Sequence, residues 1–502
     1  MNTNDPSFLK LNPDSITDGI GANFPDERSL EKLAREMFGV LQSFGGSNIP
    51  TNVLSSQNVQ KEKLPYLEDL KLTETGFSYS DFQSFPTTNI PQSGGGNIAS
   101  ARRDFPILTE TVNGKPLVWL DNAATTQKPT SVIERLSHFY FHENSNIHRA
   151  AHTLAARSTD AYEKARSLVQ GFIGAGSVEE IVFVRGTTEG INLLSNILSD
   201  KQIQAGDEIL ITHLEHHANI VPWQMVCAKK GAKLKVAPVD DSGQIILSEY
   251  ERLLNSKTKI VSITQVSNAL GTVVPVEEMT RSAHKVGALV IVDGAQSVSH
   301  MPVNVQEIDC DFFVFSGHKL FAPTGIGVVY GKKAILDSLP PWQGGGNMIK
   351  DVNFDHTTFQ EAPFRFEAGT GNIADAVGLG AAIEYLNKFG MKQISAFEHD
   401  LLEYGTKELL KVPGLRLIGT AKDKAGVLSF VVDGFKTEEI GKRLAEEGIA
   451  VRAGHHCAQP ILRRFGLEST VRPSLAFYNS CEDIDALIRV LFQLGSRNRI
   501  GI

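Results

Sequence analysis

Four apolar runs in the sequence each end in a residue that could take part in chemistry. Asp293 closes "VIVDGAQS", and Lys319 follows the apolar run in "DFFVFSGHK". A carboxylate behind a wholly apolar run is costly to bury unless it is paired, so Asp293 is interpreted either as a helix N-cap or as the partner of a cationic ligand nitrogen. Lys319 near apolar walls could have a lowered pKa and act as a nucleophile, although a lone lysine is more often a solvated surface residue.

The other two runs lead to an anion site and to a histidine. In "FVRGTTEGINLL" a strand meets Gly186, Thr187 and Thr188 just before a helix, so free amides and two hydroxyls lie at a helix N-terminus. The plainer interpretation is a threonine cap. His216 closes the run in "LEHHANIVPW", and a lone histidine is usually structural. Taken together, an acid, a lysine, an anion cradle and an aromatic ring are the groups that pyridoxal 5′-phosphate requires.

The stretch "RAGHHCAQP" places Cys457 behind two histidines in a short loop. Its thiol could be inert, a metal ligand or a nucleophile, and a nucleophile needs a lowered pKa and access. A zinc site would be short of ligands here, because two adjacent histidines point apart. The other three cysteines lie in helix or strand patterns and are expected in the core: Cys227, Cys310 and Cys481.

The elements that position these groups follow an α/β pattern. The runs "ILITHLEHH", "KIVSITQVSN", "ALVIVDGAQ" and "DFFVFSGHK" are typical of strands, and amphipathic helices such as "VEEMTRSAHKVG" lie between them. This alternation predicts a mainly parallel sheet with ligands at the carboxyl ends of its strands. We expect a large domain over residues 98–373 and a smaller α+β domain over 374–502, which begins with the helix "ADAVGLGAAIEYLNKFG" and includes the strand-like "AGVLSFVVDG".

Residues 1–97 differ from the rest in composition. They are rich in Asn, Ser, Thr, Pro and Gly, which predicts a mostly disordered arm. One amphipathic helix is predicted near residues 30–44, where an apolar stripe repeats every three or four positions: Leu30, Leu33, Met37, Leu41 and Phe44. Such a marginal helix is expected to fold on a partner or to dock on its own catalytic domain.

Charge and hydropathy exclude several classes of partner. The net charge is −8 with no long basic run, which argues against nucleic acid. No apolar run reaches the roughly 18 residues that cross a bilayer, and the first residues lack the pattern of a signal peptide. The cysteines form no Cys-x-x-Cys pair, which argues against a zinc knuckle or a disulfide framework. The sequence therefore predicts a cytoplasmic protein with no membrane or nucleic-acid partner.

From about Arg103 to the C-terminus the chain resembles the group II cysteine desulfurases, the SUF-type branch of the class V aminotransferases. The family's motifs occur in order: "LDNAATTQKP", "IHRAAHTL", "FVRGTTEGINL", "EHHANIVPWQ", "VDGAQS", "DFFVFSGHKL", "PTGIGVVYG", "RFEAGTGN" and "RAGHHCAQP". The resemblance implies a PLP-dependent transferase of fold type I, with a seven-stranded sheet in the large domain, and a homodimer. Selenocysteine lyases share this scaffold, and a scaffold that has lost its chemistry is a further alternative.

The resemblance also implies roles for residues around the cofactor. Lys319 would bind it covalently, Asp293 would pair with its ring nitrogen, and Gln296 would bond its phenolic oxygen. His216 would stack on the ring and also belongs to the expected catalytic set. The residues expected to hold the phosphate are Thr187, Thr188, Ser316 and His318, together with Thr370 from a second subunit.

A second group of residues is implied for the substrate, L-cysteine. Four match family positions around it: His148, Asn268, Arg452 and Arg472, of which Arg472 would clamp the carboxylate. Cys457 would take the sulfur as a persulfide while alanine leaves, and the sulfur would pass to an acceptor protein or a small thiol. No metal is expected. Two features depart from the family: "GTGN", where proline is common in the third place, and the long N-terminal arm.

The arm itself is similar to the cargo-loading segments of desulfurases that accompany family 2 encapsulin shells. The short motif "LEKLAREMFGVL" carries this resemblance. It implies an encapsulin shell protein as a partner and a location inside a nanocompartment in the cytoplasm. A regulatory arm and a docking element for a sulfur acceptor are the competing interpretations.

Overall fold

The computed structural model describes residues 97–148 and 152–498. These residues belong to one unit of the chain, Thr88–Ile502. The arm predicted for residues 1–97, with its helix near 30–44, lies outside the described residues apart from residue 97.

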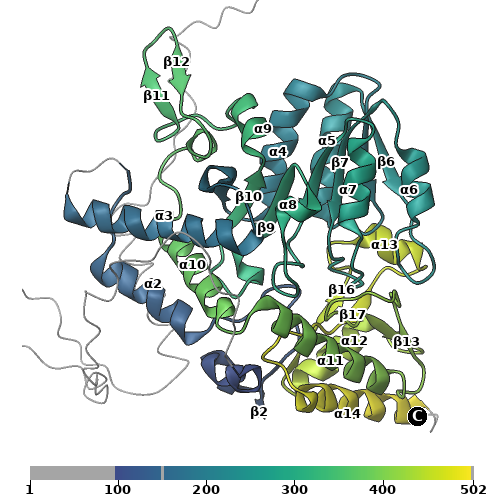
Figure 1. The fold of residues 1–502 in the computed structure, drawn as a ribbon. Coiled ribbons are helices and arrows are strands. Elements are labelled where there is room, and N and C mark those ends of the chain that lie inside the picture. Colours follow the sequence, from purple (N-terminus) through teal and green to yellow (C-terminus); the bar gives the residue numbers. More distant parts are fainter. Residues whose placement is uncertain (1–96, 149–151, 499–502) are drawn as a thin grey trace, which may run out of the picture. The chain divides into compact units, whose positions relative to one another are not determined.

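A seven-stranded sheet forms the centre of the large part (Figure 1). β10 runs antiparallel to both of its neighbours, and the remaining neighbouring pairs are parallel. The predicted α/β fold with a mainly parallel sheet is therefore confirmed. In spatial order the strands are β4 (Ile181–Val184), β10 (Gly327–Gly331), β9 (Phe312–Ser316), β8 (Leu289–Asp293), β7 (Thr258–Thr264), β5 (Glu208–Thr212) and β6 (Lys233–Ala237).

Helices cover both faces of this sheet, so successive side chains of a strand enter two different cores. Val290 and Val292 of β8 pack in one apolar cluster, and Ile291 packs in another. This two-sided burial explains why the strand sequences are continuous apolar runs and do not alternate between apolar and polar residues. The helices of this part are α2 (Thr130–His142), α3 (Thr153–Ile173), α4 (Thr187–Gln202), α5 (Val221–Lys230), α6 (Leu247–Leu253), α7 (Val276–His284), α8 (Val305–Ile308), α9 (Lys333–Ser338) and α10 (Ile373–Asn387).

The C-terminal part lies below the carboxyl ends of the central strands in Figure 1. Its sheet has the order β13 (Leu415–Leu417), β14 (Phe430–Val432), β17 (Thr470–Arg472) and β16 (Arg452–Gly454). A third apolar cluster fills the space between this sheet and its helices. The helices that pack in this cluster are α11 (Met391–Leu409), α12 (Thr437–Glu446) and α14 (Cys481–Asn498), whereas α13 (Gln459–Arg464) contributes Ile461 to the cluster that contains Val290.

The two parts share elements at their boundary. α10 packs against α2 and α3 of the large part, although the sequence assigns it to the small domain. β3 (Val118–Trp119) pairs with β15 (Ile449–Ala450) of the C-terminal part. The domain boundary at 373/374 stays a prediction.

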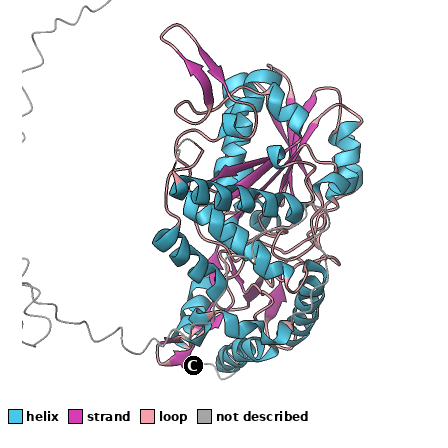
Figure 2. Ribbon diagram, turned by 60° about the vertical axis from the view of Figure 1, so that its left-hand side comes forward, coloured by secondary structure: helices cyan, strands magenta, loops and turns pink. Residues whose placement is uncertain are grey.

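Two hairpins complete the described strands. β1 (Thr111–Val112) pairs with β2 (Lys115–Pro116), and β11 (Ile349–Val352) pairs with β12 (Thr357–Phe359). The second hairpin projects away from the central sheet in both Figure 1 and Figure 2. Among the described residues, no helix is long and apolar enough to span a bilayer.

Candidate active site

A cavity of about 460 Å³ lies where the central strands end. Twelve predicted site residues line it. Nine of them form what we call the sheet wall: Thr187, Thr188, His216, Asn268, Asp293, Gln296, Ser316, His318 and Lys319. Three belong to what we call the C-terminal wall, made by residues 452–457 and 472: Arg452, Cys457 and Arg472. His148 and Thr370 do not line it.

Lys319 and Asp293 face each other across the ends of two neighbouring strands. Asp293 is the last residue of β8, and Lys319 ends the short turn that follows β9. Burial lowers the pKa of the Lys319 amine, while the charge of Asp293 acts against that shift. Burial raises the pKa of Asp293, whose Oδ1 accepts a hydrogen bond from the amide of Ala295 at 2.9 Å. The Asp293 carboxylate thus both caps the turn at Ala295 and faces the Lys319 amine.

The turn before Lys319 is held by a loop that sequence reasoning left without a role. The carbonyl oxygen of His318 accepts bonds from the Thr126 amide at 3.0 Å and from the Thr125 hydroxyl at 3.0 Å. The Thr126 hydroxyl at 3.2 Å and Lys128 Nζ at 3.3 Å lie at the same oxygen. These donors lie in "LDNAATTQKP", which is one of the family motifs. That match was the sequence signal that could have pointed to a role for this loop.

The anion cradle is formed where α4 begins against the end of β9. The Thr187 amide donates to Ser316 Oγ at 2.8 Å, and the two hydroxyls are also 2.8 Å apart. Gly186 permits this approach, because a Cβ there would lie 3.1 Å from Ser316 Oγ. Thr188 and His318 complete this side of the cavity. The amides at the start of a helix and the hydroxyls suit a phosphate group.

His216 is held in its neutral form. Burial, followed by the positive charge of Lys319, lowers its pKa to about 3. Its Nδ1 accepts a bond from the Ala218 amide at 3.0 Å, which also requires an unprotonated nitrogen there. A neutral imidazole can stack on an electron-poor ring without adding positive charge to the cavity.

Glu215 lies directly before His216 and was missed by sequence reasoning. It is fully buried, and burial raises its pKa to about 8. It bonds the Thr212 hydroxyl at 2.5 Å, the Asn219 amide at 2.7 Å and the backbone of Thr264 at 3.1 Å. These contacts join the carboxyl ends of β5 and β7, and so they fix the backbone that carries His216.

Two arginines of the C-terminal wall are brought together by strand pairing. Arg452 of β16 lies directly opposite Arg472 of β17. Asp121 binds both, with Oδ1 at 3.3 Å from Arg472 Nη2 and Oδ2 at 3.1 Å from Arg452 Nη2. Among the described residues, Arg472 Nε and Asn268 Oδ1 are buried without a partner. The cavity therefore offers a donor and an acceptor to a small polar ligand.

The cysteines differ in exposure. Cys457 is exposed and borders the cavity, whereas Cys310 is buried and Cys227 is half-buried. The core prediction is wrong for Cys481, which is the first residue of α14 and is exposed. Within the described residues, no group of three or more His, Cys, Asp or Glu side chains could hold a metal ion.

Comparisons with known proteins agree with this geometry. The model of the aminotransferase class-V family matches residues 118–487. A cysteine desulfurase of Synechococcus elongatus is 62% identical over 444 residues, which is 86% of this chain and 71% of that protein. A solved structure of an Escherichia coli cysteine desulfurase is 39% identical with a TM-score of 0.75, and covers 80% of this chain and 99% of its own.

The chain belongs to the class V aminotransferase family, among the cysteine desulfurases. A probable cysteine desulfurase of Mycolicibacterium paratuberculosis is also 62% identical, over 79% of this chain. This chain spans only 58% of that relative's length.

Pyridoxal 5′-phosphate is the cofactor of this family, and the residues of this desulfurase fit it. The cradle of α4 and Ser316 suits its phosphate, and the buried Asp293 suits a protonated ring nitrogen. Lys319 would hold it, and neutral His216 would stack on it. When bound, the cofactor supplies a ring that accepts electrons from bonds at the substrate Cα.

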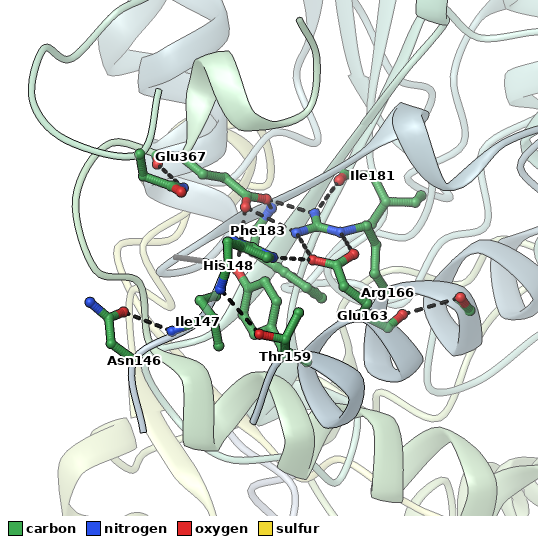
Figure 3. A network of polar contacts seen from close by, with 12 residues as sticks. Asn146, Ile147, His148, Thr159, Glu163, Arg166, Ile181, Phe183 and Glu367 are labelled. Carbon is green, nitrogen blue, oxygen red and sulfur yellow. Dashed lines mark hydrogen bonds and ion pairs between the residues drawn. The ribbon is translucent and has the colours of Figure 1, made fainter. Parts of the chain in front are cut away.

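His148 is held outside the cavity of the desulfurase by a buried polar network (Figure 3). Its Nε2 lies 2.8 Å from Glu163 Oε1, and Glu163 Oε2 lies 2.9 Å from Arg166 Nε. Arg166 in turn binds both oxygens of Glu367, at 2.7 and 3.0 Å. Thr370 follows Glu367 on an exposed loop. In one copy of the chain neither His148 nor Thr370 lines the cavity, and the network ties His148 to Glu163 of α3 instead. Their roles stay predictions.

Proposed function

We propose that this desulfurase converts L-cysteine to L-alanine and takes the sulfur onto Cys457 as a persulfide. The observation that carries the proposal is a single cavity that brings Lys319, the arginine pair and an exposed Cys457 together. An amine with a lowered pKa, a carboxylate clamp and an accessible thiol are the three groups that this reaction needs from the chain.

The chain's residues can be given roles in that reaction. Arg472, oriented by Asp121, binds the substrate carboxylate, and the unpaired Oδ1 of Asn268 can accept a hydrogen bond from a donor group of the substrate. Lys319 in its neutral form takes the proton from the substrate Cα, and the proton returns to the carbon skeleton only after the C–S bond has broken. The thiolate of Cys457 then attacks the substrate sulfur, so that an S–S bond forms while the C–S bond breaks. The electron pair of the broken bond stays with carbon, which takes up a proton and becomes the methyl group of alanine.

The finer assignment is to the SUF-type, group II branch, with a role in iron–sulfur cluster assembly. The family motifs around Cys457 and Lys319 support it, as does the exposure of Cys457, which an acceptor protein or a small thiol must reach. In a homodimer, Thr370 would reach the phosphate of the second copy, and His148 would complete a substrate site. The proposed working location is the cytoplasm.

The arm is proposed to load the enzyme into an encapsulin shell through residues 30–44. The motif "LEKLAREMFGVL" supports this proposal. Deleting residues 1–97 should leave activity in dilute solution within about twofold and abolish co-purification with a co-expressed shell protein. Lost activity in the isolated enzyme would favour a regulatory arm instead.

Product analysis tests the main proposal. The purified protein with L-cysteine should form equal amounts of alanine and sulfide in the presence of reductant, and a persulfide on Cys457 in its absence. No alanine, together with no visible absorption band, would favour a non-catalytic scaffold. Turnover that is efficient only with L-selenocysteine would make it a lyase of that amino acid.

A further inference from the structure

The turn that carries Cys457 has an unfavourable backbone conformation. His456 and Cys457 are both left-handed, with φ of 53° and 52°. This region is unfavourable for every residue other than glycine, because the Cβ approaches the following carbonyl oxygen. Two such residues in succession persist only when their surroundings hold them.

Bonds from the segments that follow β5 and β7 hold the carbonyl groups of this turn. The backbone amide of His217 donates to the carbonyl oxygen of Cys457 at 2.8 Å. Asn268 Nδ2 donates to the carbonyl oxygen of His456 at 2.7 Å. His217 follows β5 and Asn268 follows β7, so the ends of two central strands fix the two strained residues.

Two imidazole rings hold the amide groups on the other side of the turn. The Cys457 amide donates to His455 Nδ1 at 3.1 Å, and the Gln459 amide donates to His217 Nε2 at 3.4 Å. The rings of His217 and His455 are stacked, with centroids 5.9 Å apart and an angle of 24° between their planes. Each ring accepts a bond at one nitrogen, so both rings are neutral in this arrangement.

We propose that His217 and His455 are positioning residues that hold the Cys457 thiol towards the cavity. This inference rests on the proposed function of Cys457 as the sulfur acceptor. His455 binds the amide of the nucleophile's own residue, and His217 links that ring to the sheet wall through the stack and two bonds. Without the pair, the turn relaxes to an ordinary conformation, and the thiol moves away from the substrate sulfur. We propose no proton transfer by either imidazole ring.

The test separates the positioning of the thiol from the rest of the reaction. The cofactor-loaded full-length protein is mixed with one equivalent of L-cysteine, and the persulfide on Cys457 is followed by mass spectrometry. His455→Ala should slow its formation at least tenfold, while the visible band of the cofactor and its initial change with L-cysteine stay as in the parent. His455→Asn should recover most of the rate, because an asparagine side chain can accept a bond from the amide two residues later.

Two further variants test the pairing of the rings. His217→Ala should slow persulfide formation by a similar factor, and the double variant should be no more than about twofold slower than His455→Ala. His213→Ala is the matched control, a half-buried histidine in the same segment that lies outside the cavity, and it should stay within twofold of the parent.

Two results would overturn the inference in a parent protein that forms the persulfide. One is an unchanged persulfide rate in His455→Ala, even with a lower melting temperature. The other is a persulfide rate that falls as far in His455→Asn as in His455→Ala. A parent that forms no persulfide would instead contradict the proposed function itself.

Discussion

The two walls of the cavity are held in place in different ways. In the sheet wall, Asp293 and Ser316 end buried strands that are paired in register, so their positions follow from regular β geometry. In the C-terminal wall, Cys457 lies in a left-handed turn whose bonds come partly from the sheet wall. The groups proposed to bind the cofactor are therefore positioned by the sheet itself, whereas the placement of the thiol depends partly on bonds from that wall.

Replacing Lys319 should have the largest effect on activity, because it removes the central group of the sheet wall. Lys319→Ala should lower kcat/KM for L-cysteine at least about a thousandfold, which corresponds to about 4 kcal/mol. The visible band of the bound cofactor should also change or disappear, and an absorption spectrum checks this. Lys350→Ala, a change at an exposed lysine, is the control. A normal band with normal turnover would place the covalent lysine elsewhere.

Replacing Cys457 should affect the C-terminal wall alone. Cys457→Ala should lower alanine formation about a hundredfold, or about 2.7 kcal/mol, and leave the visible band intact. Cys481→Ala, at another exposed thiol, should change neither quantity. If the Cys457 variant lost its cofactor band as well, the two walls would not be separable in this way.

The pH dependence of stability should reveal the buried histidine of the strained turn. Burial, with the charges of Arg472 and Arg452, lowers the pKa of His456 to about 3 from an unfolded value of 6.5. The unfolded chain therefore binds a proton below pH 6.5 that the folded protein does not, so the free energy of unfolding falls as the pH drops from 6.5 towards 3. Between pH 7 and pH 5 this histidine contributes a loss of up to about 2 kcal/mol.

Urea unfolding at the two pH values measures that loss. His456→Asn should show a smaller difference between pH 7 and pH 5 than the parent, whatever its stability at pH 7. His399→Asn, at an exposed position on α11, should keep the parent's difference. Equal differences in the parent and the His456 variant would mean that this histidine is accessible to protons in the folded protein.

The smallest effect is expected at Asp121, which orients the two arginines without lining the cavity. Asp121→Ala should raise KM for L-cysteine about tenfold, or about 1.4 kcal/mol, and change kcat less than threefold. Steady-state kinetics measures both. Asp241→Ala is the control, because Asp241 pairs with an arginine outside the cavity. A lower KM would show that the Asp121 carboxylate competes with the substrate carboxylate.

The fold and most of the cavity could be predicted from the sequence because of where the strands end. Asp293, Lys319 and His216 each follow an apolar run, and a mainly parallel sheet gathers such residues at one edge. The family motifs supplied the remaining assignments, including the arginine pair.

The supporting residues could not be predicted, because their roles depend on contacts between distant segments. Asp121 binds an arginine 351 residues away, and the hydroxyl of Thr126 binds a carbonyl 192 residues away. Local spacing carries no information about such pairs. For Glu215 the sequence shows only an acid beside two histidines, and its burial follows from the packing of two strand ends. The position of His148 depends on a network that joins α3 to the loop after the hairpin.

The pairing of β3 with β15 joins two segments that are translated at different times. The segment that ends in Asp121 leaves the ribosome well before its strand partner and its two arginines, which come later in the chain. The C-terminal wall therefore cannot assemble until Arg452 and Arg472 have emerged. The central sheet, by contrast, is complete once β10 has emerged. A nascent chain that ends before Cys457 would thus have the groups proposed to bind the cofactor but would lack the thiol proposed to accept sulfur.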